Sequence, residues 1–366
     1  MFSSNPFYIL NIPMTANHKE IYSAVDDISL LTGDASCEDS ASALISPVRR
    51  TSAELDWFPE CDEDIICRIR DAVSSGWPVE DSAAEGLSGI SRVNADIYNL
   101  ELRVKNAGAD DSALRGDAVA RDILSIDAEL RGCRQAELLD DINLRRQVAG
   151  ITMASVEGLA DALDEKRSRT ASEIARLFAL LSDEDNVTLA NHLAGYLRDN
   201  PAAFTGSVIP ELIDRYEIQM QQVIQEQTKI LHKAVLRLEF FGMVFDIRRR
   251  ISGLCDKIEN WLRYAGPLMT AAAVRGTENK YCAAAGMDLR ELVTIVYKNK
   301  NCHSSYKLAV ILEKYFAELP SVVKELEKDI YWSGRFLKNI YHKTDEDLED
   351  MKRQTLMELS SRSLAG

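Results

Sequence analysis

The sequence predicts an all-α protein in which a small helical N-terminal domain precedes an elongated helical bundle or coiled-coil body. Three observations predict this class. Apolar residues recur at helical spacing in most segments, and strand-like alternation never lasts beyond about four residues. Only nine prolines interrupt the 366 residues. The chain is 46% hydrophobic, which supplies enough apolar material for a core.

Residues 1–71, called the head below, are expected to form a compact helical unit. A helix should begin after an N-cap at Thr15–Asn17 and end at Gly33–Asp34, because its apolar residues keep helical spacing between those points. A short helix is expected at 40–45, ahead of a proline, and a further helix at 48–58.

Two further segments follow the head. Residues 72–90 are rich in glycine, serine and proline and are expected to form a linker. Residues 91–205 are expected to form a second helical domain, with helices at 91–108, 117–181 and 186–197.

Residues 206–342 are expected to form a long-helix bundle. Apolar residues from Ile213 to Ala234 follow a 3-4-3-4 spacing, which is a heptad seam. The pattern continues to about Tyr264, so the helix would be about 80 Å long and would need an elongated bundle or a coiled-coil partner to cover it. The seam therefore offers a route to a homo-oligomer through residues 210–264. Residues 343–366 are polar and are expected to fray as a C-terminal tail.

Composition favours a protein of the reduced cytoplasm. The chain holds seven cysteines, an odd number, with no Cys-x-x-Cys pair. No Lys or Arg precedes Lys19, which argues against a signal peptide. The most apolar runs, 238–245 and 268–274, are shorter than the roughly 20 residues that a membrane-spanning helix needs.

The net charge of −15 makes nonspecific binding to nucleic acid unfavourable, so no nucleic-acid partner is expected. Two basic clusters, Arg248–Arg250 and Lys298–Lys300, could each bind phosphates, and Tyr297 and Tyr306 stand near the second. The alternative is that these clusters pair with neighbouring acidic residues at helix ends.

No linear motif of a common enzyme class occurs, and no catalytic, cofactor-binding or metal-binding residue is predicted. Cys282, Cys302 and His303 share one region, but they lack the paired spacing of a zinc site. The sequence therefore favours a non-catalytic binding protein over an enzyme. A helical enzyme without linear motifs is one alternative, and a component of a bacterial conflict or effector system is another.

The head carries a resemblance to a known family. Residues 5–12 (NPFYILNI), then Thr-Ala at 15–16 and Glu-Ile at 20–21, resemble the opening of a J domain. Residues 43–50 (ALISPVRR) and 53–56 (AELD) resemble its later helices. The resemblance covers residues 5–58 and implies a J-like helical fold of the DnaJ type.

One departure from the family decides what the resemblance implies. A J domain stimulates an Hsp70 chaperone ATPase through a His-Pro-Asp tripeptide, and this chain has Gly-Asp-Ala at 33–35. The head also carries 5 Lys and Arg against 13 Asp and Glu, which opposes the usual basic docking face. We therefore expect an adaptor that cannot stimulate a standard Hsp70 and that binds an unusual Hsp70-type ATPase or a different protein. Its expected contact residues are Lys19, Tyr22, Asp26, Asp27, Arg49 and Arg50.

Overall fold

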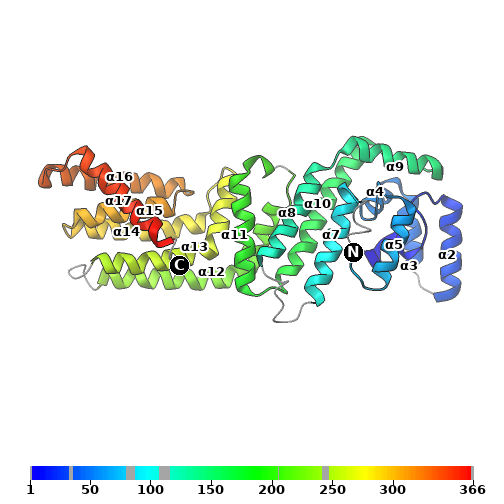
Figure 1. Ribbon diagram of the computed structural model, residues 1–366, viewed down its shortest axis with the longest axis horizontal. Helices are drawn as coiled ribbons and strands as arrows, with labels where there is room; N and C mark the ends of the chain where they lie inside the picture. Colours follow the sequence, from blue (N-terminus) through cyan, green and yellow to red (C-terminus); the bar gives the residue numbers. More distant parts are fainter. Residues whose placement is uncertain are drawn as a thin grey trace. The chain divides into compact units, whose positions relative to one another are not determined.

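Helices account for all regular structure in the part of the chain that the structure describes (Figure 1). The computed structural model describes residues 2–32, 36–79, 87–106, 116–204, 206–240 and 247–363. These residues form sixteen α-helices and two 3-10 helices, with no strand among them. The all-α fold class is therefore confirmed. The tripeptide at 33–35 lies outside the described residues.

The chain divides into two compact units. The first contains Met1–Leu193 and Ala202–Tyr216, and the second contains Ala194–Pro201 and Glu217–Gly366. The first unit begins with the 3-10 helix η1 (Phe2–Ser4), α1 (Pro6–Ile9), α2 (His18–Thr32), α3 (Ser36–Ile45), α4 (Pro47–Leu55) and α5 (Glu63–Ser74). It continues with α7 (Gly89–Asn106), α8 (Gly116–Gly132), α9 (Gln135–Ala149) and α10 (Val156–Phe178).

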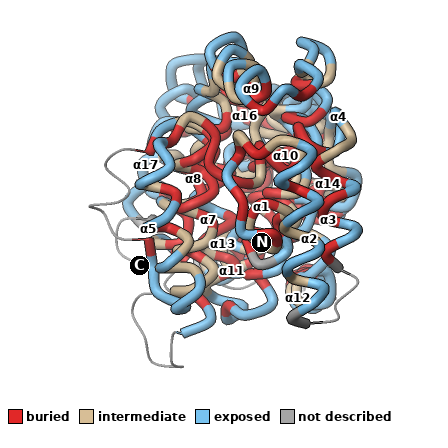
Figure 2. The backbone as a smooth tube through the Cα atoms, turned by 90° about the vertical axis from the view of Figure 1, so that its right-hand side faces the viewer, coloured by how far each residue is buried: buried red, intermediate tan, exposed pale blue. Residues whose placement is uncertain are grey.

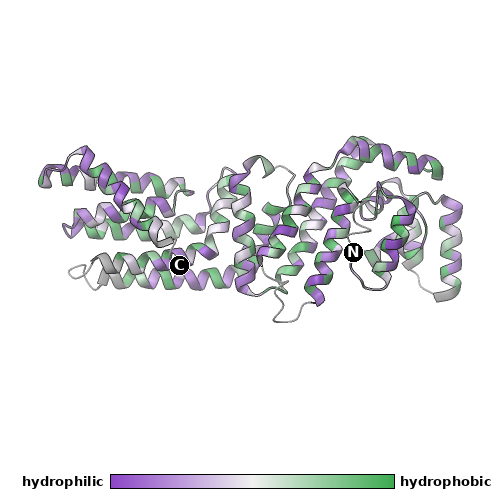
Figure 3. Ribbon diagram, in the orientation of Figure 1, coloured by the Kyte–Doolittle hydropathy of each residue, from purple (hydrophilic) through white to green (hydrophobic). Residues whose placement is uncertain are grey.

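The boundary between the units falls within helices. The elements that cross it are α11 (Asp183–Asp199), the 3-10 helix η3 (Pro201–Phe204) and α12 (Ile209–Phe240). The second unit then holds α13 (Ile247–Val274), α14 (Lys280–Lys298), α15 (Cys302–Tyr315), α16 (Pro320–Tyr341) and α17 (Asp345–Ser363). Hydrophilic and hydrophobic residues alternate around most of these helices, as amphipathic packing requires (Figure 3).

Local capping explains where several helices begin. The amide of Asn17 donates to Glu20 Oε2 at 2.8 Å, and the amide of Glu20 donates to Asn17 Oδ1 at 3.0 Å. This reciprocal capping box starts α2 at the predicted place. Asn5 caps α1 by accepting from the amide of Phe7, and Pro6 fills the first helical position, where no amide hydrogen is needed.

Three expected segments differ in the structure. The helix expected at 117–181 is divided into α8, α9 and α10, and α9 ends at Gly150, whose φ of 64° favours glycine. Within the expected linker, Val79 is buried, and both of its backbone groups bond to the side chain of Asn99. The single helix of about 80 Å expected over residues 210–264 is two helices, because α12 ends at Phe240 and α13 begins at Ile247. Asn260 and Trp261 of α13 donate to Gln227 and Thr228 of α12, so the two helices lie side by side, and α13 continues through Pro267 to Val274.

The C-terminal segment forms a helix where a frayed tail was expected. A second capping box, made by Thr344 and Asp347, starts α17. The helix buries four side chains at spacings of three and four residues: Leu348, Met351, Thr355 and Leu359. This apolar stripe was hidden because charged residues outnumber apolar ones along the helix.

The core of the head is built around Trp57, which is fully buried. The ring of Phe2 lies 5.8 Å from that of Trp57 and 5.1 Å from that of Phe58. Tyr98 of α7 joins the same cluster, 5.2 Å from Phe2. A helix outside the head therefore completes its core.

A buried ionic network joins the head to α9. Glu54 of α4 accepts from Arg50 at 2.9 Å and from Arg146 of α9 at 2.8 Å, and all three side chains are buried. Arg50 also donates to the carbonyl oxygens of Met14, Ala16 and Leu44, and Arg146 donates to Thr51, Pro47 and Thr152. Because each charge is paired and hydrogen-bonded, the network tolerates burial.

Removing Glu54 should destabilise the first unit strongly. The Glu54→Ala variant leaves two guanidinium groups buried without a counter-ion, and we expect a loss of about 3–5 kcal/mol in the free energy of unfolding. Urea denaturation followed by circular dichroism measures it. Asp164→Ala breaks the exposed pair with Arg167 and is the matched control, with an expected loss under about 1 kcal/mol. Equal losses in the two variants would contradict the role of the network.

Candidate interaction surfaces

The structure places most of the predicted contact residues on the outside of α2. Lys19, Tyr22, Asp26 and Asp27 are all exposed. Figure 2 shows α2 mostly in the exposed colour, and Ile21 is its one buried residue among the described side chains. Arg49 on α4 is also exposed. Whether these residues bind a partner stays a prediction.

Arg50 is a correction to the predicted surface. Its side chain is fully buried and belongs to the ionic network with Glu54. Burial lowers the pKa of Arg50, and the Glu54 carboxylate opposes that change. Adjacent basic residues at the start of a helix point about 100° apart, so Arg49 faces solvent while Arg50 faces the core.

The outer face of α2 combines acidic and apolar side chains. Tyr22, Asp26 and Leu30 stand at successive spacings of four residues and therefore share one face. Tyr22 is 57% exposed and Leu30 is 86% exposed. The opposite face packs into the head through Ile21 and the partly buried Ile28. The α2 face, meaning residues 19, 22, 26 and 30, is thus an exposed surface on a fixed helix.

In the second unit, α16 exposes aromatic side chains that sequence reasoning missed. Tyr331 is 61% exposed and Trp332 is 52% exposed, and their rings lie 5.3 Å apart. The guanidinium carbon of Arg335 lies 5.5 Å from the Trp332 ring, a cation–π contact. Lys324 and Lys328 lie on the same side of the helix by spacing and are exposed. We call Lys324, Lys328, Tyr331, Trp332 and Arg335 the α16 face.

The two units differ strongly in charge. By sequence, the first unit carries 19 Lys and Arg against 37 Asp and Glu, and the second carries 24 against 21. The whole-chain charge of −15 therefore comes from the first unit. Surfaces on the two units consequently favour partners of different charge.

The predicted basic clusters are only partly described. The side chains of residues 248–250 lie outside the described set. Lys298 and Lys300 are exposed, but Tyr306 is buried and donates its hydroxyl hydrogen to the carbonyl of Leu348. Tyr306 is therefore a core residue and is not available to stack on a ligand.

Part of the expected heptad seam on α12 is buried within this chain. Along α12 the buried apolar side chains include Leu212, Ile213, Tyr216, Met220, Ile224, Leu231 and Val235, so burial follows the helical period of 3.6 residues. The first expected seam positions, Ile213, Tyr216 and Met220, lie on this face, whereas the later ones turn away from it, and Ile230 is 46% exposed. Pairing of α12 with another chain stays a prediction.

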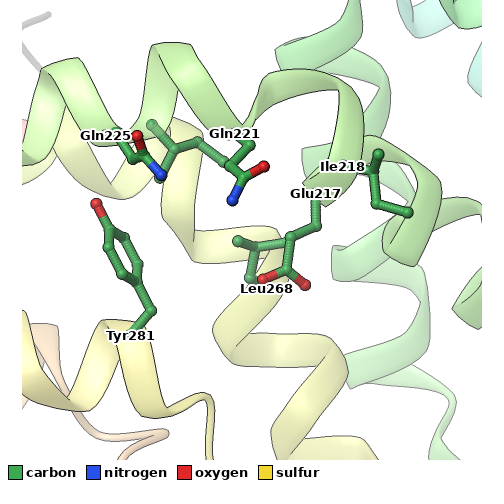
Figure 4. Close-up of a pocket in the computed structure, with 7 residues that line it drawn as sticks. Glu217, Ile218, Gln221, Gln225, Leu268 and Tyr281 are labelled. Atoms are coloured by element: carbon green, nitrogen blue, oxygen red, sulfur yellow. The ribbon is translucent and has the colours of Figure 1, made fainter.

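A cavity of about 320 Å³ opens beside α12 in the second unit. Its lining combines one carboxylate, two amides, a phenol and apolar groups: Glu217, Gln221, Gln225, Tyr281, Ile218, Ile224 and Leu268. Figure 4 shows the side chains of Glu217 and both glutamines extending from α12 toward the gap, with Tyr281 on its other side. The spacing of Glu217, Gln221 and Gln225 by four residues was the sequence signal that could have indicated this polar stripe.

A second cavity, of about 260 Å³, lies in the first unit and is lined by residues of α7 and α8. Its charged side chains already pair with one another. Arg92 lies 3.0 Å from Asp96, and Arg103 forms an ion pair with Asp122. The charges of this cavity are thus satisfied within the protein.

Lys166 on α10 is buried, as reactive lysines often are, but its ammonium group is already engaged in hydrogen bonds. Its ammonium group donates to Asp56 Oδ1 at 3.0 Å and to Asn94 Oδ1 at 2.6 Å. Burial lowers the pKa of Lys166, and Asp56 opposes the change. Since the side chain is fully buried and holds two acceptors from other segments, it joins the end of α4 to α7 and α10.

Glu60 is a carboxyl group whose pKa the fold raises strongly. Burial, followed by the charges of Asp141 and Glu137, raises the pKa of Glu60 to about 7, while Arg145 opposes the change. Its Oε2 atom is buried without a hydrogen-bond partner. The backbone φ of Glu60 is 65°, and its amide donates to Asp141 Oδ2 at 3.0 Å. Glu60 lines neither cavity, so we assign it no catalytic role.

Metal binding has no support within the described residues, where no group of three or more His, Cys, Asp or Glu side chains could hold an ion. The cysteines are free, and His303 is exposed while Cys282 and Cys302 are buried. Over the same described ranges, no helix has the combination of length and apolar character that crossing a membrane requires.

Comparison with known proteins identified no relative. The sequence matches no protein family and no curated protein, and the fold matches no solved structure.

The stability of the protein should depend on pH through Glu60. Its pKa is raised in the folded state from 4.5 to about 7, so the folded protein binds more protons here than the unfolded chain between those values. Stability from this site is therefore lost as the pH rises from about 4.5 to 7. The Glu60→Gln variant should be more stable than the natural protein at pH 8, and the difference should shrink toward pH 4.5.

Urea denaturation at several pH values measures this difference. Glu63→Gln changes a nearby exposed carboxylate and is the matched control, for which no such shrinking is expected. A Glu60→Gln difference that stays constant across the window would show that the carboxyl titrates normally.

Proposed function

We propose that this chain is a non-catalytic adaptor that binds one protein through the α2 face and a second protein through the α16 face. The observation that carries the proposal is the α2 face itself. A helix whose inner side already contributes to a core still exposes Tyr22 and Leu30 to solvent. Exposed apolar residues grouped on one face, with polar residues around them, mark binding sites.

Charge complementarity narrows the first partner. The α2 face carries Lys19 and Asp26 beside its apolar residues, so its own charges balance, but the first unit around it has 37 acidic residues against 19 basic ones. The partner should therefore offer a basic surface with an apolar centre. The resemblance to a J domain suggests an unusual Hsp70-type ATPase as the first partner to examine. Without His-Pro-Asp, binding should leave the ATP turnover of a standard Hsp70 unchanged.

The α16 face supports a second partner of opposite character. Aromatic side chains and arginine are enriched among residues that dominate binding energy at protein interfaces. Tyr331, Trp332 and Arg335 bring these types together on one exposed helix surface. Lys328 is paired with Glu325 at 2.5 Å, so Lys324 and Arg335 are the basic groups of this face that favour an acidic protein surface over a basic one.

Substitution of the α2 face should weaken binding without unfolding the protein. A photo-crosslinking residue at the exposed position Ser29 of the full chain captures the bound protein in cells, and calorimetry with the purified partner then measures Kd. Replacing Tyr22 and Leu30 together with Ser removes two apolar side chains that the partner would bury in the complex, so Kd should rise more than about tenfold.

The matched control replaces Leu144 and Val148 on α9 with Ser. These side chains are also exposed and apolar, but they lie outside the α2 face. The control should bind within about twofold of the natural protein, since most surface contacts outside an interface contribute nothing to affinity. Equal affinity of both double variants for the captured protein would overturn the proposal.

A further inference from the structure

The cavity beside α12 has the chemistry of a cation site. Glu217 contributes a carboxylate that is partly buried, and it makes no hydrogen bond or ion pair with any other described residue. The nearest basic residue on the helix, Arg215, lies 3.5 Å from Glu211 instead. A partly buried carboxylate without a counter-ion favours a cationic ligand.

The negative charge of Glu217 raises the pKa of a neighbouring thiol. The Cys282 thiol, one residue beyond Tyr281, has its pKa raised to about 12, by burial first and by the negative charge of Glu217 second.

Tyr281 is held in a fixed position across the gap. Its hydroxyl group donates to Thr228 Oγ1, and the same oxygen accepts from the indole nitrogen of Trp261 at 2.8 Å. Thr228 in turn donates to the carbonyl of Ile224 at 2.8 Å. Since the hydroxyl hydrogen is engaged, Tyr281 can offer a ligand only its ring and the lone pairs of its oxygen, and an aromatic ring attracts a cation through its face.

The remaining lining specifies the shape of the ligand. Gln221 and Gln225 supply amide oxygens, which accept hydrogen bonds from N–H donors. Leu268 and Ile224 supply a buried apolar floor suited to a short aliphatic stem. In Figure 4 the carboxylate and the amides stand at successive turns of α12 along one side of the same gap.

We propose that this cavity binds an organic cation, an ammonium or guanidinium group on a short aliphatic stem, with Glu217 as its counter-ion. The volume of about 320 Å³ lies at the lower end of the range for small-molecule sites. The same group occurs in free amines and in lysine and arginine side chains of peptides. This inference is independent of the α2 and α16 faces.

Calorimetry on the full chain at low salt tests the site with three probes of equal stem length: butylguanidinium, butylammonium and uncharged butanol. Both cations should bind more tightly than butanol. In Glu217→Gln their Kd should rise about fivefold or more, because a charge-assisted hydrogen bond is lost. Glu226→Gln, an exposed change on the opposite side of α12, is the matched control and should change Kd less than about twofold.

A fourth probe, acetyl-Gly-Arg-Gly-amide, separates the two sources of the cation. Binding at least as tight as that of butylguanidinium assigns the site to an arginine of a peptide, and weaker binding assigns it to a free amine. Cations that bind no more tightly than butanol, or equally to Glu217→Gln, would overturn the proposal. If Glu217→Gln does not fold, Glu217→Ala replaces it, and cation binding as tight as that of the natural protein is the overturning result.

Discussion

The carboxylate of Glu54 is the group on which the first unit depends. It is buried between Arg50 of its own helix and Arg146 of α9, and it is the counter-ion of both. Burying three charges is unfavourable unless each is paired and every remaining donor has an acceptor. The carbonyl groups of Met14, Ala16 and Leu44 provide acceptors from the head, and the carbonyl of Thr152 provides one from beyond it. The network is therefore complete only when α9 is in place.

This constraint determines which surfaces are left for partners. Asn94 of α7 donates to the carbonyls of Leu55 and Trp57, Lys166 of α10 bonds to Asp56, and Tyr98 packs on Phe2. The head is thus covered on several sides by helices that follow it in the chain. The outer face of α2 stays exposed, and it is the surface that the proposed adaptor would use. A fragment ending at residue 71 would lose these contacts, so functional work requires the full chain.

Local patterns predicted local structure well. The start of α2, the short helices before and after Pro47 and the absence of strands in the described chain followed from capping residues and apolar spacing. Long-range pairing could not be predicted in the same way. Arg50 looked like a surface residue because its buried network includes Arg146, which lies 96 residues away and cannot be inferred from the neighbouring sequence. The α17 stripe and the α16 face were missed because the charged residues around them masked the arrangement of the apolar ones. The polar stripe of Glu217, Gln221 and Gln225 could be recognised as the lining of a cavity only from the fold, which places Tyr281 across from it.

Native-state hydrogen exchange on the full chain tests most directly whether the head and the helices around it form one cooperative unit. Amides in α4, α7 and α10 should open with one shared free energy, equal to that for unfolding of the first unit, because the contacts of Glu54, Asn94 and Lys166 must break together. A head whose amides open as a separate group, at a lower free energy than those of α7 and α10, would contradict this dependence and return the N-terminal helices to the status of an autonomous domain.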